Sequence, residues 1–308
     1  MFVLPSPLQQ IIHPIPLKYG VKLFIKRDDL IHTDISGNKW RKLKFNIEKY
    51  NQNKYDSILT FGGAYSNHIA ATAKAGQVLG ISTIGIIRGD ELNENSNSTL
   101  KMAFNNGMKL EFVSRSKYSE RYERIYHEEL RATYGNVLIV NEGGANFHGV
   151  LGCAEILKEI DFEPDYVYAA SGTGTTVAGL LLSAKASKIV SVPVLKNGGF
   201  IKDEMIDLLK QFQLLDQDLK AKIAQFSMNL DSHFGGYGKF NSDLIRFIND
   251  FYFETKIKLD QIYTAKMMYA LLGDIISGKI KKNSTVVALH TGGLQGLSSI
   301  KNELDFMI

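Results

Sequence analysis

Hydrophobic and polar positions along this chain follow two alternating periods. Short apolar runs, such as residues 21–26, are followed by longer segments in which apolar residues recur every three or four positions. Trp40, Leu43, Ile47 and Tyr50, for example, fall on one face of a helix. Repeated alternation of this kind predicts an α/β protein with parallel sheets flanked by helices on both faces.

The same pattern gives the expected bounds of the elements. Strands are expected at residues 21–26, 57–61, 83–87, 109–113, 137–140, 166–170, 189–195 and 285–290. Helices are expected over the segment from Trp40 to Tyr50 and at residues 67–79, 98–106, 118–133, 149–160, 175–186, 203–212, 243–253, 263–276 and 294–304. The helix at 67–79 is expected to end at Gly80, because glycine readily adopts the left-handed conformation that closes helices.

Composition narrows the class of protein. The 308 residues are more typical of two domains than of one, and a hydrophobic content of 44% is ordinary for a soluble globular protein. The net charge of +4 is mild and the basic residues are dispersed, so no nucleic-acid partner is expected. The single cysteine, Cys153, suits a reducing compartment. No signal peptide or membrane-spanning run is seen, which predicts a cytoplasmic protein without a membrane partner.

Three glycine-containing motifs come where predicted strands give way to helices. They are GGAYSNH (62–68), SGTGTT (171–176) and HTGG (290–293). Ligands in parallel α/β folds collect at this edge of the sheet. In SGTGTT the glycines let amide groups converge on an anion, and the following helix dipole favours negative charge. The alternative for SGTGTT is a plain turn with a hydroxyl cap.

A lysine supplies the second chemical candidate. Lys39 lies in SGNKWRKL (36–43), just inside a predicted helix start. A lysine amine attacks an aldehyde only when it is neutral, and Arg41 and Lys42 could lower its pKa. Alone, Lys39 reads as a surface residue in a basic turn. Together with the glycine motifs it predicts an enzyme that uses pyridoxal 5'-phosphate, whereas no spacing of His or Cys predicts a metal site.

Seven motifs in this order resemble one known family. They are KRDD (26–29), SGNKWRKL, GGAYSNH, SGTGTT, GGYG (235–238), IYTAKMM (262–268) and HTGG. The chain resembles the D-cysteine desulfhydrase and 1-aminocyclopropane-1-carboxylate deaminase family, within the tryptophan synthase β-like (fold type II) pyridoxal phosphate enzymes. The resemblance implies a large cofactor-binding domain of residues 1–46 and 147–308, a small domain of residues 47–146, and a site in the cleft between them. It also implies a homodimer and a small amino acid substrate.

The resemblance assigns roles to individual residues, with Lys39 as the Schiff-base lysine. The residues that match catalytic positions are Lys39, Ser66, Tyr237 and Tyr263. Those that match cofactor-binding positions are Lys39, Lys42, Asn67, Gly172, Thr173, Gly174, Thr175, Thr176, Thr264 and Thr291. Those that match substrate-binding positions are Ser66, Asn67 and His68.

Thr264 and Thr291 distinguish two activities within the family. Ring-opening deaminases resemble one another in carrying Glu at the position of Thr264 and Leu at that of Thr291. A carboxylate beside the pyridine nitrogen keeps it protonated and makes the ring a strong electron sink, whereas a hydroxyl leaves it largely neutral. The weaker sink suffices when a thiolate leaves the β-carbon. The sequence therefore predicts a lyase that converts D-cysteine to pyruvate, ammonia and sulfide.

Other positions keep alternatives open. Ser36 replaces the usual glycine before GNK, while Gln261 and Ala265 replace a proline and a glycine. These departures leave the identity of the substrate open. The alternatives are 1-aminocyclopropane-1-carboxylate deamination, another pyridoxal phosphate-dependent deaminase or racemase, and a non-catalytic protein that binds the cofactor.

Overall fold

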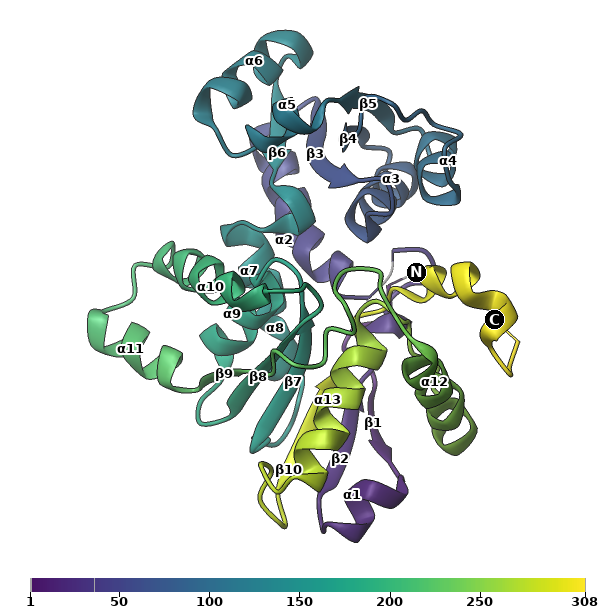
Figure 1. Ribbon diagram of the computed structural model, residues 1–308. Helices are drawn as coiled ribbons and strands as arrows, with labels where there is room; N and C mark the ends of the chain where they lie inside the picture. The colour runs from purple at the N-terminus through teal and green to yellow at the C-terminus, as the bar shows by residue number, and fades with distance from the viewer. Residues whose placement is uncertain (1, 36, 308) are drawn as a thin grey trace. The chain divides into compact units, whose positions relative to one another are not determined.

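The computed structural model describes residues 2–35 and 37–307, which form two compact units (Figure 1). The larger unit contains the chain up to residue 38 together with the chain from residue 153 onward, and the smaller unit contains residues 39–152. The sequence placed the boundaries at 46/47 and 146/147. Ser36, which the sequence motif includes, lies outside the described residues.

The larger unit is built on a six-stranded sheet with the order β1-β2-β10-β7-β8-β9. Every pairing is parallel except that of β1 with β2. Ala288 of β10 pairs with Ile25 of β2 and with Tyr168 of β7, which brings the carboxyl ends of these three strands to one edge. The strands are β1 (Leu8–Ile11), β2 (Lys22–Lys26), β7 (Tyr166–Ser171), β8 (Lys188–Pro193), β9 (Phe226–Met228) and β10 (Thr285–Leu289).

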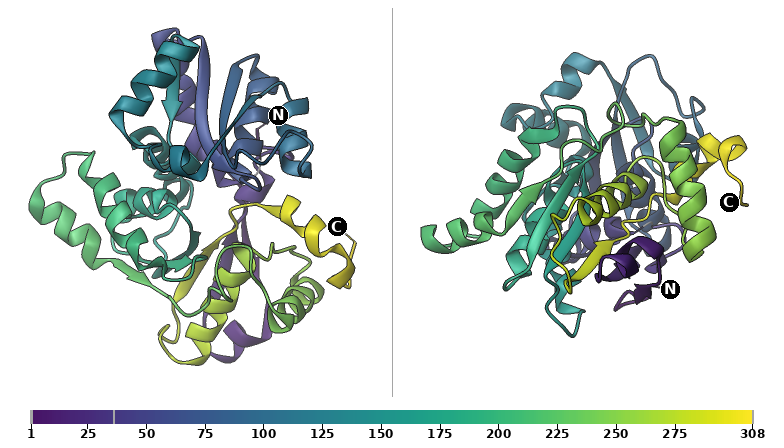
Figure 2. Two further views of the ribbon diagram at one scale, coloured as in Figure 1. Left: turned by 45° about the horizontal axis from the view of Figure 1, so that its top comes forward. Right: turned by 60° about the horizontal axis from the view of Figure 1, so that its bottom comes forward.

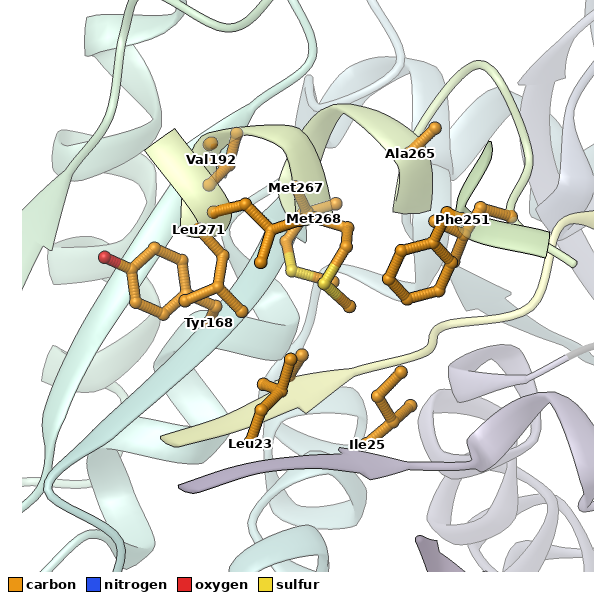
Figure 3. Packing of buried hydrophobic residues seen from close by; sticks show 14 of the residues in the cluster. Leu23, Ile25, Tyr168, Val192, Phe251, Ala265, Met267, Met268 and Leu271 are labelled. Carbon is orange, nitrogen blue, oxygen red and sulfur yellow. The ribbon is translucent and has the colours of Figure 1, made fainter. Parts of the chain in front are cut away.

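Two helices, α12 (Ser242–Thr255) and α13 (Thr264–Ile276), cover the same core of this sheet. Figure 3 shows Met267, Met268 and Leu271 of α13 above residues of the strands. Burial of each such side chain contributes about 1.5–3 kcal/mol. The other helices of the unit are α1 (Pro14–Lys18), α8 (Glu155–Lys158), α9 (Thr175–Ser183), α10 (Ile201–Lys210) and α11 (Asp216–Ala224).

The smaller unit has a four-stranded parallel sheet with the order β5-β4-β3-β6. One hydrophobic cluster joins the sheet to α3 and α4, and another joins it to α5 and α6, so helices lie on both faces (Figure 2). The strands are β3 (Ser57–Gly63), β4 (Ser82–Arg88), β5 (Lys109–Val113) and β6 (Val137–Val140). The helices are α2 (Asn38–Asn53), α3 (Asn67–Leu79), α4 (Ser98–Asn105), α5 (Arg115–Ser119), α6 (Arg124–Tyr134) and α7 (Phe147–Cys153).

The parallel α/β architecture confirms the fold predicted from the sequence, while several elements differ. The predicted helix 118–133 is interrupted between α5 and α6, where His127 Nε2 lies 2.8 Å from the Arg121 carbonyl oxygen and Arg121 Nε donates to Glu142 Oε2 at 2.8 Å. The predicted helix 149–160 is interrupted at Ala154. The last predicted helix is a 3₁₀ helix, η4 (Leu294–Glu303), with non-helical backbone at Ile300.

Short or polar segments account for the elements that the sequence pattern missed. These are the edge strands β1 and β9 and the helices α1 and α11. A four-residue strand such as LQQI carries too few positions to establish a period. Within the described residues, no helix has the length and apolar character needed to cross a membrane.

Candidate active site

The predicted site residues fall into two groups, one in each unit. The smaller unit carries Lys39, Lys42, Ser66, Asn67 and His68. The larger unit carries Gly172, Thr173, Gly174, Thr175, Thr176, Tyr237, Tyr263, Thr264 and Thr291.

The turn between β7 and α9 has the features of an anion site. Gly174 is the N-cap of α9 with a left-handed φ of 63°, and it offers no side chain to cap the helix. Thr175 and Thr176 begin the helix and are buried, and Thr173 Oγ1 lies 3.0 Å from Thr175 Oγ1. The first amide groups of a helix have no intrahelical acceptor and attract anions. This turn can therefore present several donors to a phosphate group.

Asn38, the last residue of the N-terminal segment of the larger unit, contacts the turn between β7 and α9. Its Nδ2 donates to Thr176 Oγ1 at 2.8 Å, and its backbone N–H donates to the Thr291 carbonyl at 3.3 Å. Gly37 has a φ of 58° and passes so close to the Thr291 carbonyl that a Cβ would overlap it. These contacts fix the residue that precedes Lys39. The sequence interpretation did not single out Asn38, although its place between Gly37 and Lys39 was a usable signal.

His290 organises the loop that carries Thr291. The Gly292 N–H donates to His290 Nδ1 at 3.3 Å, and Asp29 Oδ1 lies 3.4 Å from the same nitrogen. His290 Nε2 donates to the Lys258 carbonyl at 2.7 Å. Since the ring is buried and bonded on both sides, it holds the loop rather than facing a ligand.

A buried carboxylate caps α13, the helix that begins with Thr264. Asp260 Oδ1 accepts the amides of Ile262 at 2.8 Å and Tyr263 at 2.7 Å. Asp260 Oδ2 accepts the amide of Thr264 at 3.0 Å and its hydroxyl at 2.7 Å, while Thr264 Oγ1 accepts the amide of Asp260 at 2.8 Å. The hydroxyl proton of Thr264 is thus committed to Asp260. The sequence interpretation missed Asp260, whose role depends on how the chain turns before α13.

Tyr263 lies next to two other candidate residues. Its ring and that of Tyr237 form an edge-to-face pair, with centroids 6.1 Å apart and an interplanar angle of 76°. A Cβ built on Gly172 would lie 3.7 Å from both Cε1 and Oη of Tyr263. Tyr237 remains 44% exposed. The larger unit therefore brings the phosphate-type turn and both predicted tyrosines together.

In the smaller unit, Ser66 starts α3 directly after β3. Its Oγ accepts the amide of Ile69 at 3.3 Å, and its own amide donates to the Gly63 carbonyl at 3.0 Å. The hydroxyl can still donate its proton, and the half-buried Ser66 and Asn67 mark the positive end of the α3 dipole. This arrangement suits a carboxylate.

His68 is buried in the first turn of α3. Thr60 Oγ1 donates to the Val140 carbonyl at 2.7 Å, so it accepts from His68 Nε2 at 2.9 Å and places the ring proton on Nε2. Burial, reinforced by the positive charges of Lys39 and Lys42, holds the pKa of His68 well below its usual value. The ring is therefore neutral, and the sequence interpretation missed its partner Thr60. A role for His68 in substrate binding stays a prediction.

Lys39 lies in the first turn of α2 and Lys42 at the start of the next. They are three positions apart on the helix and so lie on neighbouring turns of one face. The Lys42 side chain is buried. Because both lysines act on the pKa of His68, the three side chains belong to one electrostatic cluster.

Comparisons with known proteins identify the family. The model of the pyridoxal-phosphate-dependent enzymes matches residues 2–292, so the chain belongs to that family. A bifunctional D-cysteine desulfhydrase/1-aminocyclopropane-1-carboxylate deaminase of Arabidopsis thaliana is 28% identical and covers 96% of this chain and 77% of its own length. A D-cysteine desulfhydrase of Klebsiella pneumoniae is 27% identical over 94% of each chain.

The fold comparison agrees with the family. A crystal structure described as an ACC deaminase homologue superposes with a TM-score of 0.79 at 24% identity, covering 98% of this chain and 95% of that one. These findings confirm the resemblance, the fold type and the pyridoxal phosphate cofactor predicted from the sequence.

The residues present fit that cofactor. The uncapped N-terminus of α9 and the hydroxyls of Thr173 and Thr175 would hold its phosphate. Lys39 would supply the amine for its aldehyde. Within the described part of the chain, no group of three or more His, Cys, Asp or Glu residues is placed to bind a metal ion.

Proposed function

We propose that this protein is a pyridoxal phosphate-dependent lyase that acts on D-cysteine. The reaction removes the α-proton and expels the β-thiolate as sulfide. Water then releases the amino group as ammonia and leaves pyruvate, so that D-cysteine and one water give pyruvate, ammonia and hydrogen sulfide. Membership of the family and the names of the Arabidopsis and Klebsiella relatives support this proposal.

The environment of Thr264 carries the choice of reaction. Its hydroxyl proton is donated to Asp260, so the side chain offers a neutral oxygen where ring-opening relatives are expected to place a carboxylate. Asp260 is itself saturated by three amides and this hydroxyl. A neutral oxygen stabilises a protonated pyridine nitrogen far less than a carboxylate does. This environment favours a reaction with a good leaving group on the β-carbon.

The remaining roles follow from the contacts of each residue. When bound, the cofactor supplies the electron sink for carbanion chemistry. Lys39 would remove the α-proton, and the α3 N-terminus with Ser66 and Asn67 would orient the substrate carboxylate. The rings of Tyr237 and Tyr263 would pack against the bound substrate.

The assembly and compartment belong to the same proposal. We infer a homodimer from the resemblance to the family, and size-exclusion chromatography with light scattering tests it directly. The burial of Cys153 and the absence of other cysteines in the sequence support a reducing, cytoplasmic location.

Parallel assays of two substrates test the reaction. Cofactor-saturated protein is offered D-cysteine and, separately, 1-aminocyclopropane-1-carboxylate, and pyruvate, sulfide and 2-oxobutyrate are measured. The proposal expects pyruvate and sulfide from D-cysteine and nothing from the cyclopropane. Formation of 2-oxobutyrate would instead establish ring opening, the activity that the Arabidopsis relative's name also includes.

A lysine variant tests the catalytic assignment. Lys39→Ala is expected to abolish turnover, with a loss of at least about 10³-fold, because no other group would carry the proton and the cofactor linkage. Lys49→Ala on the same helix is the matched control and should retain activity. Equal turnover in Lys39→Ala and the native protein would refute the assignment.

A further inference from the structure

Lys266 is a fully buried lysine that the proposed reaction does not use. It lies one turn after Tyr263 in α13, and its side chain is 0% exposed. Its Nζ donates to the His233 carbonyl and to the Gly236 carbonyl, each at 2.8 Å. Burying an amine is unfavourable unless its hydrogen bonds are replaced, so these two carbonyls account for its place in the core.

The two carbonyls belong to the loop that carries Tyr237. Residues 233–239 form no helix or strand, and the backbone is left-handed at Phe234 (φ 51°), Gly235 (φ 92°) and Gly236 (φ 117°). The Gly235 amide donates to His233 Nδ1 at 3.0 Å, within the loop itself. This conformation is readily adopted by the two glycines, but at Phe234 it is costly and persists only where surrounding contacts hold it. Lys266 supplies two of those contacts from outside the loop.

The start of α13 contacts the loop twice. Tyr263 is the N-cap of α13 and Lys266 lies three positions later, in its first turn, so both lie at the start of this helix. Tyr263 meets the ring of Tyr237, whereas Lys266 binds the carbonyl of the residue just before it. Tyr237 is thus fixed at its ring and at its backbone by the same helix.

We propose that Lys266 is a positioning residue that holds the 233–239 loop so that Tyr237 stays against Tyr263. The catalytic consequence rests on the proposed function, in which both tyrosines pack against the substrate. Burial lowers the pKa of Lys266 to about 8, and the Asp260 carboxylate offsets part of that effect. Both the ammonium and the neutral amine retain two N–H donors for the two carbonyls.

Hydrogen exchange of the loop tests the positioning role without reference to turnover. Lys266→Met keeps the length and apolar stem of the side chain but removes both donors. In the cofactor-loaded protein, peptides covering 233–239 should exchange about tenfold faster or more, while peptides of α10 stay unchanged. Lys279→Met is the matched control, since that exposed lysine bonds Asp274 Oδ1 at 2.9 Å, on a residue outside the loop.

Loop exchange in Lys266→Met equal to that of the native protein would overturn the proposal. If the methionine variant does not fold, Lys266→Gln, which keeps a shorter amide donor, should give an intermediate increase confined to the loop. An increase spread evenly over the larger unit would show a purely structural role and would also overturn the proposal. Hydrogen exchange is measured without any substrate. The result for Lys266 therefore holds even if the protein shows no activity on D-cysteine.

A double-mutant cycle then tests whether Lys266 acts through Tyr237. Using the substrate that the protein turns over, Lys266→Met should lower kcat/KM about tenfold in the native background. In the Tyr237→Ala background the same change should have little further effect, because the group being positioned is already gone. If Lys266→Met lowers kcat/KM by the same factor in both backgrounds, Lys266 does not act through Tyr237.

Discussion

Two helices of the larger unit, α9 and α13, begin with opposite solutions to the same physical problem. Both start at candidate site residues, and both have first-turn amide groups without intrahelical acceptors. At α13 the Asp260 carboxylate accepts three amides and a hydroxyl. At α9 the cap position is Gly174, which has no side chain, so the first-turn amides remain for another anion.

The difference between the two helices shows that one N-terminus supports neighbouring side chains while the other remains available to bind an anion. A negative charge at a helix N-terminus is stabilised by the dipole, and at α13 the side chain of the buried Asp260 occupies that position. This makes α13 a rigid base for Tyr263, Thr264 and Lys266. The same electrostatic preference at α9 is left for a phosphate, which arrives with the cofactor.

Removal of the Asp260 carboxylate should have the largest effect on stability. Asp260→Ala leaves three amides and the Thr264 hydroxyl without their acceptor in a buried place. Loss of a cap costs about 1 kcal/mol, and unsatisfied buried donors add about 1–3 kcal/mol each. We expect the free energy of unfolding, measured in urea, to fall by about 3 kcal/mol or more.

Asp216→Ala is the control for Asp260→Ala. Asp216 is an exposed residue in the first turn of α11. It should cost less than about 0.5 kcal/mol, as exposed substitutions generally do. Similar losses in the two variants would show that the Asp260 contacts contribute no more than an ordinary first-turn charge.

A negative charge placed at the start of α9 should weaken cofactor binding. Its expected free-energy effect is smaller than that of Asp260→Ala on unfolding. Gly174→Asp and Gly174→Asn share the left-handed backbone and a Cβ 3.2 Å from the Ile201 carbonyl oxygen, so their strain is nearly equal. Only the aspartate carries a charge that competes with phosphate. A dipole interaction of up to about 2 kcal/mol predicts pyridoxal phosphate affinity about tenfold lower in the aspartate variant than in the asparagine variant.

Absorbance titration with pyridoxal phosphate, at one fixed ionic strength, measures that difference. The asparagine variant is the internal control for strain and size. Equal affinities in the two variants would show that the α9 N-terminus is not where the phosphate binds.

The contrast between these helices also explains what the sequence could reveal. The SGTGTT turn was recognisable because strand, glycines and helix follow one another within a few residues, and the structure places α9 from Thr175 as expected. The capping role of Asp260 was not recognisable. The preceding stretch forms neither a helix nor a strand, and periodicity does not predict the turn that folds the Asp260 carboxylate back onto α13.

Tertiary contacts account for the other differences. Lys266 lies in an apolar helical segment and would ordinarily be expected at the surface, but the loop carbonyls of His233 and Gly236 satisfy it in the core. Residues 294–304 have a helical pattern, yet the structure forms a 3₁₀ helix that follows the left-handed Gly293 and has non-helical backbone at Ile300. Neither outcome depends on local sequence alone.

The N-terminus of α3 differs from those of α9 and α13, because its first turn contains a buried neutral histidine, His68. The effect of this histidine on stability should be measurable at low pH. The pKa of His68 is far lower in the folded protein than its ordinary value of about 6.5. Below that value the unfolded chain binds a proton that the folded chain does not. The stabilising effect is therefore complete above about pH 6.5 and is lost as pH falls towards the folded-state pKa.

His68→Gln removes this titration while keeping a donor for Thr60. Urea unfolding between pH 7 and pH 5 should show a flatter loss of stability than in the native protein, by at most about 1.4 kcal/mol per pH unit, because one proton is involved. His148→Gln is the control, since burial lowers the pKa of that half-buried ring to a lesser degree. Identical pH profiles for His68→Gln and the native protein would mean that His68 can accept a proton without cost. The α3 turn would then tolerate a positive charge at its N-terminus, which would separate it from both α9 and α13.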